Sequence, residues 1–490
     1  MVASDPAVKD WSVIIDAFTA ALGAKKVVRR KEEILVYECD GLTSYRQRPA
    51  VVVLPHSTEE VAEAVKICNR FQVPFVARGA GTGLSGGALP LADSVLIVTA
   101  TMGNILAVDL DNQRVVVQPG VINNWVTQAV GGAGFYYAPD PSSQSVCSVG
   151  GNVAENSGGV HCLKYGVTTN HVLGLKLVLP SGEVVEVGGP VAETPGYDLC
   201  GVFVGSEGTL GIATEITLRI LKTPASVQVL LADFAEVDAA GAAVSAITSA
   251  GIIPAGLEMM DNFSINAVED VVATACYPRD AAAILLIEID GLPAEVAATG
   301  DRIQQLCRQN GARSITVATD PEERLRLWKG RKAAFAAMGK LSPDYYVQDG
   351  VIPRTQLPYV LREIEALGAH HGYRVANVFH AGDGNLHPLI LYNNSIPGQL
   401  EQVEELGGDI LKLCVRVGGS ISGEHGIGAD KRCYMPDMFS AADLETMAWV
   451  RQAFNPDGLA NPTKLLPTPR TCGEAASSAA AIAFPGLERY

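Results

Sequence analysis

Two histidines in the second half of the chain have the spacing to bind a metal ion. His380 and His387 flank the dipeptide Asp383-Gly384, which is typical of a two-residue type I′ hairpin turn. With Asp383 and Gly384 as the turn residues, residue 380 pairs with residue 387. Paired residues have Cβ atoms about 4.5–5.5 Å apart on one face, a separation from which two imidazoles can bind one ion. The alternative is a surface hairpin with two incidental histidines.

A glycine-rich stretch, residues 418–428, adds a carboxylate and a third imidazole. Glu424 would complete a set of two imidazoles and one carboxylate with open positions for a substrate, and such a set can take zinc, manganese or iron. His425 is then left for proton transfer, because an imidazole with its usual pKa of about 6.5 suits general base catalysis. The sequence therefore predicts a divalent metal on His380, His387 and Glu424, with His425 as the base.

A second chemical signal is a run of glycines at residues 79–87 in the first half of the chain. Without Cβ atoms, successive backbone N–H groups can converge on a phosphate. Residues 81–86 formally match the G-x-G-x-x-G pattern of a Rossmann fold, but that pattern must begin a helix at the pyrophosphate. Gly87 and Pro90 argue against a helix start here, so the sequence disfavours NAD. An ordinary tight loop is the alternative to a phosphate site.

Two more glycine-rich tracts lie in the same half of the chain, at residues 150–159 and 205–211, and residues 139–143 precede the first of them. Three such tracts imply one long ligand, and FAD, with its pyrophosphate and ribityl chain, fits better than a mononucleotide. The predicted cofactor-binding residues in these segments are Arg78, Gly79, Ala80, Gly81, Thr82, Gly83, Ser85, Gly86, Pro139, Asp140, Ser142, Gly150, Gly151, Asn152, Asn156, Gly158, Gly159, Glu207, Gly208, Gly211 and Ile212.

Strands and helices must bring the first glycine loop to its ligand. Residues 50–54 and 74–77 are apolar runs typical of buried strands. Between them, Ser57 and Glu60 have the spacing of a capping box, and apolar residues at helical spacing follow. The sequence therefore predicts strand, helix and strand, with the glycine loop directly after the second strand. Short β-rich segments then continue to about residue 220.

The sequence pattern changes after these segments to strand, alanine-rich helix and strand, which predicts two domains and an α+β fold class. The first, residues 1–224, has an N-terminal extension, residues 1–49, before a cofactor-binding core, residues 50–224. The second, residues 225–466, is a substrate- and metal-binding cap domain that ends back at the cofactor. Residues 467–490 form an alanine- and serine-rich tail, for which we expect partial disorder.

Composition limits the functions open to this chain. Its 490 residues exceed what one hydrophobic core usually supports, and 48% apolar with 18% charged residues are typical of a folded protein. A formal net charge of −16, without lysine or arginine clusters, argues against nucleic-acid binding. The ten cysteines show no C-x-x-C spacing, which favours reduced thiols over iron–sulfur or zinc sites. We see no signal peptide or transmembrane run, so we expect a cytoplasmic protein.

Residues 50–224, with their three glycine-rich tracts, resemble the FAD-binding domain of the vanillyl-alcohol oxidase superfamily. Several members of that superfamily carry a histidine just after the first glycines as a covalent flavin anchor. This chain has Thr82 nearby instead. The resemblance therefore implies a vanillyl-alcohol-oxidase-type domain that binds FAD noncovalently.

The second half of the chain resembles the ferredoxin-like α+β cap domain of FAD-linked 2-hydroxy-acid dehydrogenases, which include glycolate and D-lactate dehydrogenases. The resemblance rests on residues 380–387 and 418–428, and it extends to residues 256–262 and to Asn461-Pro462-Thr463-Lys464. It implies that the two histidines and the glutamate bind a divalent metal and that the next histidine is the base. It also adds Asn461 to the cofactor-binding residues.

The same resemblance implies a mechanism. The metal would bind the carboxylate and the 2-hydroxyl of the substrate, His425 would take the hydroxyl proton, and hydride would pass from C2 to flavin N5. Arg331 stands where relatives carry an arginine that grips the substrate carboxylate. A solvated helix arginine is the alternative for this residue. The implied enzyme is an FAD-dependent dehydrogenase in glycolate metabolism or photorespiration.

Substrate and partners follow from the same family. Relatives that act on 2-hydroxyglutarate carry a lysine and an asparagine where this chain has Val347 and Leu389, which favours glycolate or D-lactate. The resemblance to the catalytic subunits of bacterial glycolate oxidases implies a second FAD-type subunit and an iron–sulfur subunit, with attachment at the membrane through them. Three alternatives stay open: a noncatalytic electron-relay subunit, a D-2-hydroxyglutarate dehydrogenase, and an oxygen-reducing oxidase of other alcohols.

Overall fold

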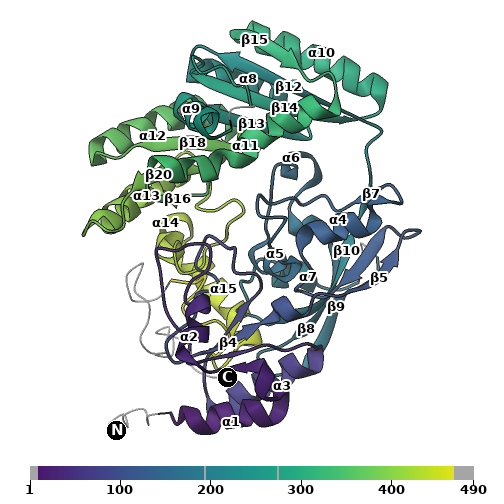
Figure 1. Ribbon diagram of the computed structural model, residues 1–490, viewed down its shortest axis with the longest axis vertical. Helices are drawn as coiled ribbons and strands as arrows, with labels where there is room; N and C mark the ends of the chain where they lie inside the picture. The colour runs from purple at the N-terminus through teal and green to yellow at the C-terminus, as the bar shows by residue number, and fades with distance from the viewer. Residues whose placement is uncertain (1–8, 192–194, 273–274, 468–490) are drawn as a thin grey trace.

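The computed structural model describes residues 9–191, 195–272 and 275–467, and Figure 1 shows two halves stacked along its long axis. The lower half contains two smaller sheets from the N-terminal part of the chain, and the upper half contains one large sheet. Helices and strands occur in both halves, so the predicted α+β class is confirmed. The tail predicted from residue 467 lies, except for Pro467, outside the described residues.

The first sheet is built from the continuous apolar runs that the sequence shows. Strands β2 (Val51–Val53), β4 (Val95–Val98) and β3 (Phe75–Arg78) lie parallel in that order, and β1 (Val27–Val28) pairs antiparallel with β2. Helix α3 (Thr58–Phe71) connects β2 to β3 and packs its apolar face into the core beside this sheet. The glycine loop begins directly after β3, and no helix forms between it and β4.

The start of α3 differs from the predicted capping box. Ser57 Oγ accepts a hydrogen bond from Glu60 N at 3.4 Å, as predicted. The Glu60 carboxylate does not return to Ser57, because it accepts from His56 N at 2.8 Å and forms an ion pair with Lys26. A charged partner attracts a carboxylate more strongly than a second backbone N–H does. Glu60 therefore joins α3 to the segment before β1.

The second sheet is antiparallel and forms the other wall of the lower half. In its central strand alternate residues are buried, as expected for a strand with one face on a core. Helices α4 (Asn123–Gly131), α5 (Val149–Glu155) and α7 (Leu199–Phe203) contribute to that core. Its strands, in spatial order, are β5 (Ile105–Asp109), β6 (Arg114–Val117), β10 (Ile212–Arg219), β8 (Val172–Val178) and β9 (Val184–Gly188).

The large sheet of the upper half, which we call the cap, is covered on both faces. Leu230 and Phe234 of β12 pack into one apolar cluster, and Val229 and Leu231 pack into another. Helices α8 (Val237–Ser249), α10 (Pro293–Gln309), α12 (Leu357–His371) and α13 (Gln399–Arg416) cover the first face, and α9 (Asn262–Val271) and α11 (Pro321–Leu341) cover the other. The strand order is β15 (Ala312–Val317), β12 (Ser226–Phe234), β14 (Ala283–Gly291), β13 (Gly256–Asp261), β18 (Val375–His380), β19 (Asn385–Leu386) and β17 (Gly350–Val351), with β20 (Pro388–Tyr392) between β18 and β16 (Asp344–Val347).

After the cap, the chain returns to the lower half. Phe454 at the end of helix α15 (Ala441–Phe454) packs edge-on against Phe203 of α7, with ring centroids 5.0 Å apart, and Ala460 forms a parallel bridge with Phe75 at the start of β3. Asn461 Nδ2 donates to Gly87 O at 2.9 Å, at the end of the glycine loop. The C-terminal segment therefore supports the loop that the sequence predicts to bind phosphate.

Two expectations drawn from composition can be compared with the structure. Within the described residues, no helix is both long enough and apolar enough to cross a membrane. Reduced thiols were expected throughout, but Cys433 is disulfide-bonded, so that expectation is wrong at this position. The cysteines recorded as free thiols are Cys39, Cys68, Cys147, Cys162, Cys200, Cys276, Cys307 and Cys414.

Candidate functional site

The hairpin that carries His380 has a different turn from the predicted one. His380 pairs with Asn385, so the turn contains four residues instead of two. Gly384 has a φ of 76°, but Asp383 is not among the residues with positive φ, and a type I′ turn requires both. Ile352 N donates to Gly384 O at 2.9 Å. The turn is therefore held by a contact from the residue that follows β17, which the local sequence does not reveal.

The corrected register still keeps the two histidines together. Asn377 pairs with Pro388, which places His387 diagonally across from His380 on the same face. Their ring centroids lie 5.1 Å apart. Glu424 Oε1 lies 3.2 Å from His380 Nε2 and 3.2 Å from His387 Nε2, and the three ligand atoms lie within 4.8 Å of one another. We call these three residues the metal-ligand set.

The surroundings of His387 indicate that the metal-ligand set is suited to binding an ion. The His387 side chain is buried, its Nδ1 makes no hydrogen bond within the described part of the chain, and its Nε2 lies beside the Glu424 carboxylate without hydrogen-bond geometry. Buried polar atoms are normally paired, because an unpaired one loses its water without compensation. Two imidazole nitrogens and a carboxylate oxygen converging here match the donors that divalent transition metals prefer.

Glu258 of β13 stands behind the metal-ligand set. Its Oε1 lies 2.7 Å from His380 Nδ1, and its Oε2 accepts from Arg331 Nε at 2.9 Å. Burial raises the pKa of Glu258, but the charges of His380 and Arg331 outweigh burial and hold that pKa below its usual value. A carboxylate on Nδ1 fixes the ring and leaves Nε2 for an ion, as in many metal-bound histidines.

Arg331 has a different environment from the one its predicted role requires. Its side chain is only 3% exposed, and Arg331 Nη2 lies 2.7 Å from Glu258 Oε2. The next residue, Lys332, lines the cavity described below, whereas Arg331 does not. Because Nε and Nη2 both face Glu258, this geometry gives no support to a grip on the substrate carboxylate. It supports a role in neutralising Glu258.

His425 lies against the metal-ligand set. Its ring stacks on that of His387 with centroids 4.9 Å apart and an interplanar angle of 8°, and its Nε2 lies 4.0 Å from Glu424 Oε1. Burial lowers the pKa of His425 to about 4. At neutral pH its imidazole is therefore uncharged and can accept a proton.

The loop with Glu424 and His425 is anchored by two buried carboxylates from different halves of the molecule. Asp349, next to β17, accepts from the backbone N–H groups of Glu424 at 3.2 Å and His425 at 2.9 Å. Glu207, from a glycine tract of the lower half, accepts from Ile427 N at 2.7 Å and from Gly428 N at 2.8 Å. The loop is thus fixed at both ends.

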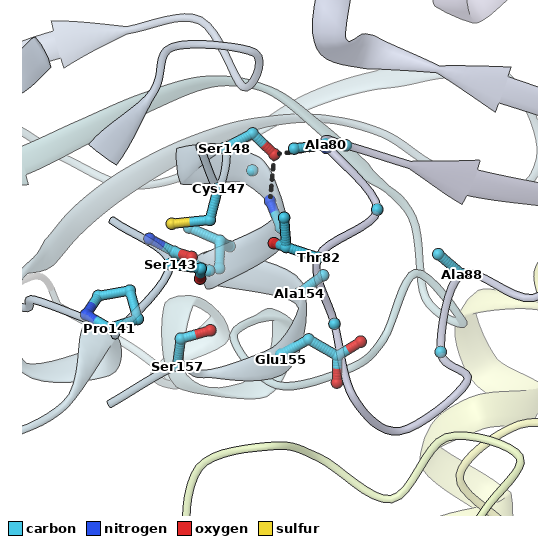
Figure 2. A pocket seen from close by; sticks show the side chains of 18 of the residues that line it. Ala80, Thr82, Ala88, Pro141, Ser143, Cys147, Ser148, Ala154, Glu155 and Ser157 are labelled. Carbon is cyan, nitrogen blue, oxygen red and sulfur yellow. Dashed lines mark hydrogen bonds between the residues drawn. The ribbon is translucent and has the colours of Figure 1, made fainter. Parts of the chain in front are cut away.

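A cavity of about 510 Å³ runs from the first glycine loop to the metal-ligand set. Figure 2 shows its lower wall, where Thr82 and Ala80 face Ser143, Ser157 and Glu155. Ligand cavities commonly have this size. The predicted residues that line it are Arg78, Gly79, Ala80, Gly81, Thr82, Gly83, Ser142, Gly150, Gly151, Asn152, Gly158, Glu207, Gly208, Gly211, Ile212, His387, Glu424 and His425.

Other predicted cofactor residues support these walls from behind. Ser85 O accepts from Ala429 N at 3.0 Å, and Asn156 Oδ1 accepts from Thr169 N at 2.9 Å. Asn461 holds the end of the glycine loop, as described above. The predicted cofactor-binding residues absent from the cavity lining are Ser85, Gly86, Pro139, Asp140, Asn156, Gly159 and Asn461, and the predicted site residues His380 and Arg331 are absent as well.

Ser148 joins two glycine tracts and was missed by the sequence reasoning. Its Oγ caps α5 by accepting from Gly151 N at 3.4 Å, and it also accepts from Ala80 N at 3.2 Å (Figure 2). A Cβ on Gly79 would lie 2.1 Å from this Oγ, so only glycine fits there. The N-cap spacing from Ser148 to the glycines after it could have revealed this residue.

The cap wall of the cavity was also missed. This wall contains Phe335 and Ala336, which lie one helical turn after Lys332 on α11, and Tyr345 on β16. The Phe335 ring packs edge-on against His387 with centroids 6.1 Å apart. An apolar face of this width on a helix usually packs into a core, so its spacing alone does not reveal a cavity wall.

Comparison with known proteins now identifies the family. A profile described as "FAD binding domain" matches residues 49–188, and one described as "FAD linked oxidases, C-terminal domain" matches residues 223–465. The glycolate oxidase subunit GlcD of Escherichia coli (strain K12) is 50% identical over 98% of this chain and 97% of its own length. This chain belongs to the FAD-linked oxidase family. The predictions of an FAD-linked enzyme and of its family are thereby confirmed.

Other comparisons agree with membership of the FAD-linked oxidase family. The D-lactate dehydrogenase of Anaerostipes hadrus is 34% identical over 86% of this chain and 90% of its own length. The 4-ethylphenol oxidase from Gulosibacter chungangensis superposes with a TM-score of 0.79 at 18% identity and covers 93% of this chain and 96% of its own. At that identity the likeness shows the fold alone. Together with the two matching family models, it confirms the predicted vanillyl-alcohol-oxidase-type fold.

Proposed function

We propose that this FAD-linked oxidase is a metal-dependent dehydrogenase that oxidises a small 2-hydroxy acid, glycolate or D-lactate, to the 2-oxo acid. One observation carries the proposal: three ligand atoms converge beside an uncharged histidine at one end of the cavity whose other end is the glycine loop. The chemistry of a 2-hydroxy acid, with adjacent carboxylate and hydroxyl, matches a site with a chelating ion next to a base.

The residues of this chain bind and orient the substrate in the proposed reaction. His380, His387 and Glu424 would hold a divalent cation, zinc, manganese or iron, which supplies Lewis-acid activation of the hydroxyl when bound. FAD, held noncovalently because Thr82 provides no anchor, supplies the hydride acceptor. His425 Nε2 faces the metal-ligand set and accepts the hydroxyl proton.

A small substrate is favoured by the pair Val347 and Leu389. These residues face each other in the register of β16 and β20, and both are buried in an apolar cluster. Neither residue lines the cavity, so the preference rests on the resemblance: relatives that act on 2-hydroxyglutarate carry polar residues at these two positions, and a site without them would leave a second carboxylate unpaired. The names of the relatives, glycolate oxidase subunit and D-lactate dehydrogenase, point to the same substrates.

The test is dye reduction by the purified, FAD-loaded protein with glycolate, D-lactate, L-lactate and D-2-hydroxyglutarate as substrates. Each assay is repeated after treatment with a chelator and after addition of zinc, manganese or iron. Turnover of glycolate or D-lactate that disappears with chelator and returns with one metal would support the proposal. Bound FAD without turnover of any substrate would favour a noncatalytic relay subunit, and turnover of D-2-hydroxyglutarate alone would overturn the substrate assignment.

The electron acceptor of the proposed enzyme is a partner protein. Because the relative in Escherichia coli is named as a subunit, we propose that this chain also works in a complex. A second FAD-type subunit and an iron–sulfur subunit would receive the electrons and attach the otherwise cytoplasmic chain to the membrane. Slow reoxidation of the reduced flavin in air would support this assignment, whereas fast reoxidation would favour an oxygen-reducing oxidase.

A further inference from the structure

His161 connects the two halves of the molecule through both of its ring nitrogens. It precedes the short helix α6 (Cys162–Tyr165), which Figure 1 shows at the top of the lower half, below β14 and α11 of the cap. Nδ1 lies 2.8 Å from Asp140 Oδ2 in the same half, and Nε2 lies 2.9 Å from Glu288 Oε1 in β14. Neither contact is used in the proposed reaction.

On the cap side, the connection continues to the cavity wall. Glu288 Oε2 accepts from Trp328 Nε1 at 2.6 Å, so one carboxylate holds both His161 and helix α11. The side chains that line the cavity begin four residues further along this helix with Lys332, and they include Phe335 beside His387. A displacement of Glu288 would therefore move the wall that faces the metal-ligand set.

On the other side, the connection reaches a glycine tract and the metal-ligand set. Asp140 Oδ1 accepts from His161 N at 3.2 Å, which fixes the backbone that follows the tract. A Cβ on Gly158 would lie 2.5 Å from Glu424 Oε2, so this backbone packs directly against the third ligand. His161 thus stands between the two surfaces whose spacing defines the cavity.

The carboxylates around His161 favour a protonated imidazole that donates a hydrogen bond from each ring nitrogen. Only the protonated ring can donate at both nitrogens, and here each nitrogen faces a carboxylate. Burial lowers the pKa of His161, but Asp140 and Glu288 outweigh burial and raise it well above its usual value. The neighbouring Asp290 is already engaged by Lys164 and by Tyr165 Oη. Those contacts join the same two halves without His161.

We propose that His161 is a positioning residue that joins the flavin-binding half to helix α11 of the cap and thereby sets the width of the cofactor cavity. The proposal goes beyond the reaction, because it concerns how tightly the two halves enclose the bound cofactor. When His161 loses its proton, one of its two hydrogen bonds is lost. The two halves should therefore enclose FAD less tightly as the pH rises through the raised pKa of His161.

The test measures FAD release, which needs no substrate and no metal and so is independent of the proposed activity. The rate is followed by the recovery of flavin fluorescence after dilution of the FAD-loaded protein. It is measured at several pH values from about pH 6 to about pH 10. The variants are His161→Gln and Glu288→Gln, singly and combined. The matched control is His371→Gln, because His371 pairs with Asp409 at 3.3 Å within the cap and away from the cavity.

For the wild type and His371→Gln, we expect FAD release to accelerate at high pH. For His161→Gln, we expect release about tenfold faster at neutral pH and nearly independent of pH, because one charge-assisted hydrogen bond is lost. Glu288→Gln should give a similar acceleration, and the double variant should add little, since both remove the same contact. A wild-type rate and pH profile in His161→Gln, or full additivity with Glu288→Gln, would overturn the proposal. If His161→Gln does not fold, Glu288→Gln alone tests the same contact.

Discussion

The carboxylate of Asp349 accepts a hydrogen bond from the backbone N–H of His425 at 2.9 Å. The same carboxylate accepts from Gly423 N, from Ser422 Oγ at 2.6 Å and from Lys431 Nζ at 3.2 Å. Burial raises the pKa of Asp349, but the nearby positive charges, above all Lys431, hold that pKa well below its usual value. One buried charge therefore holds the end of this loop that carries Glu424 and His425.

We expect Asp349→Asn to destabilise the fold and to misplace this loop. The neutral amide leaves the Lys431 ammonium buried without its partner, and breaking a buried pair costs about 3–5 kcal/mol. Denaturant unfolding measures the loss, and metal analysis of the folded fraction should show less bound metal. The control is Asp344→Asn on the adjacent strand, where Oδ2 only accepts from Asn394 N at 2.9 Å. Equal stability of the two variants would contradict this role.

Glu258→Gln should weaken metal binding without removing a ligand. The carboxylate fixes the His380 ring through Nδ1, and loss of such a partner usually lowers metal affinity by about 10- to 100-fold. Competition with a chromogenic chelator measures the affinity. His370→Ala on the outer helix α12 is the control and should bind metal like the wild type. If Glu258→Gln also retained wild-type affinity, the metal would have to bind elsewhere.

Ser148→Ala should weaken FAD binding more than it weakens the fold. The Oγ fixes Ala80 N and Gly151 N in the two glycine tracts, and the net loss of one or two hydrogen bonds corresponds to about a three- to tenfold decrease in affinity. Fluorescence titration with FAD measures the change. Ser440→Ala removes the equivalent N-cap of α15 and should cost similar stability with unchanged FAD affinity. A similar affinity loss in both variants would indicate a general effect of helix capping.

The sequence revealed the residues that line the candidate site better than it revealed the residues that hold them in place. Glycine tracts and the histidine and glutamate residues could be found because their residue types have few other uses in these patterns. The register of the hairpin could not be found, because Ile352, the residue after β17, holds the turn from a distant part of the chain. Glu258 and Asp349 were also missed as supports, since a buried carboxylate is recognised only by its partners. Arg331, which donates to Glu258, and Ser422, which donates to Asp349, are each 73 residues away in the chain.

His425→Asn should separate proton transfer from binding. The backbone N–H of residue 425 still donates to Asp349, and none of the three proposed metal ligands is changed, so metal and FAD contents should equal those of the wild type. Loss of the proton acceptor should lower turnover of glycolate or D-lactate by about 10²- to 10⁴-fold. Glu424→Gln gives the contrasting result, because it removes a ligand and should lose both metal and turnover. A His425→Asn enzyme that keeps more than about a tenth of wild-type turnover would place the general base elsewhere.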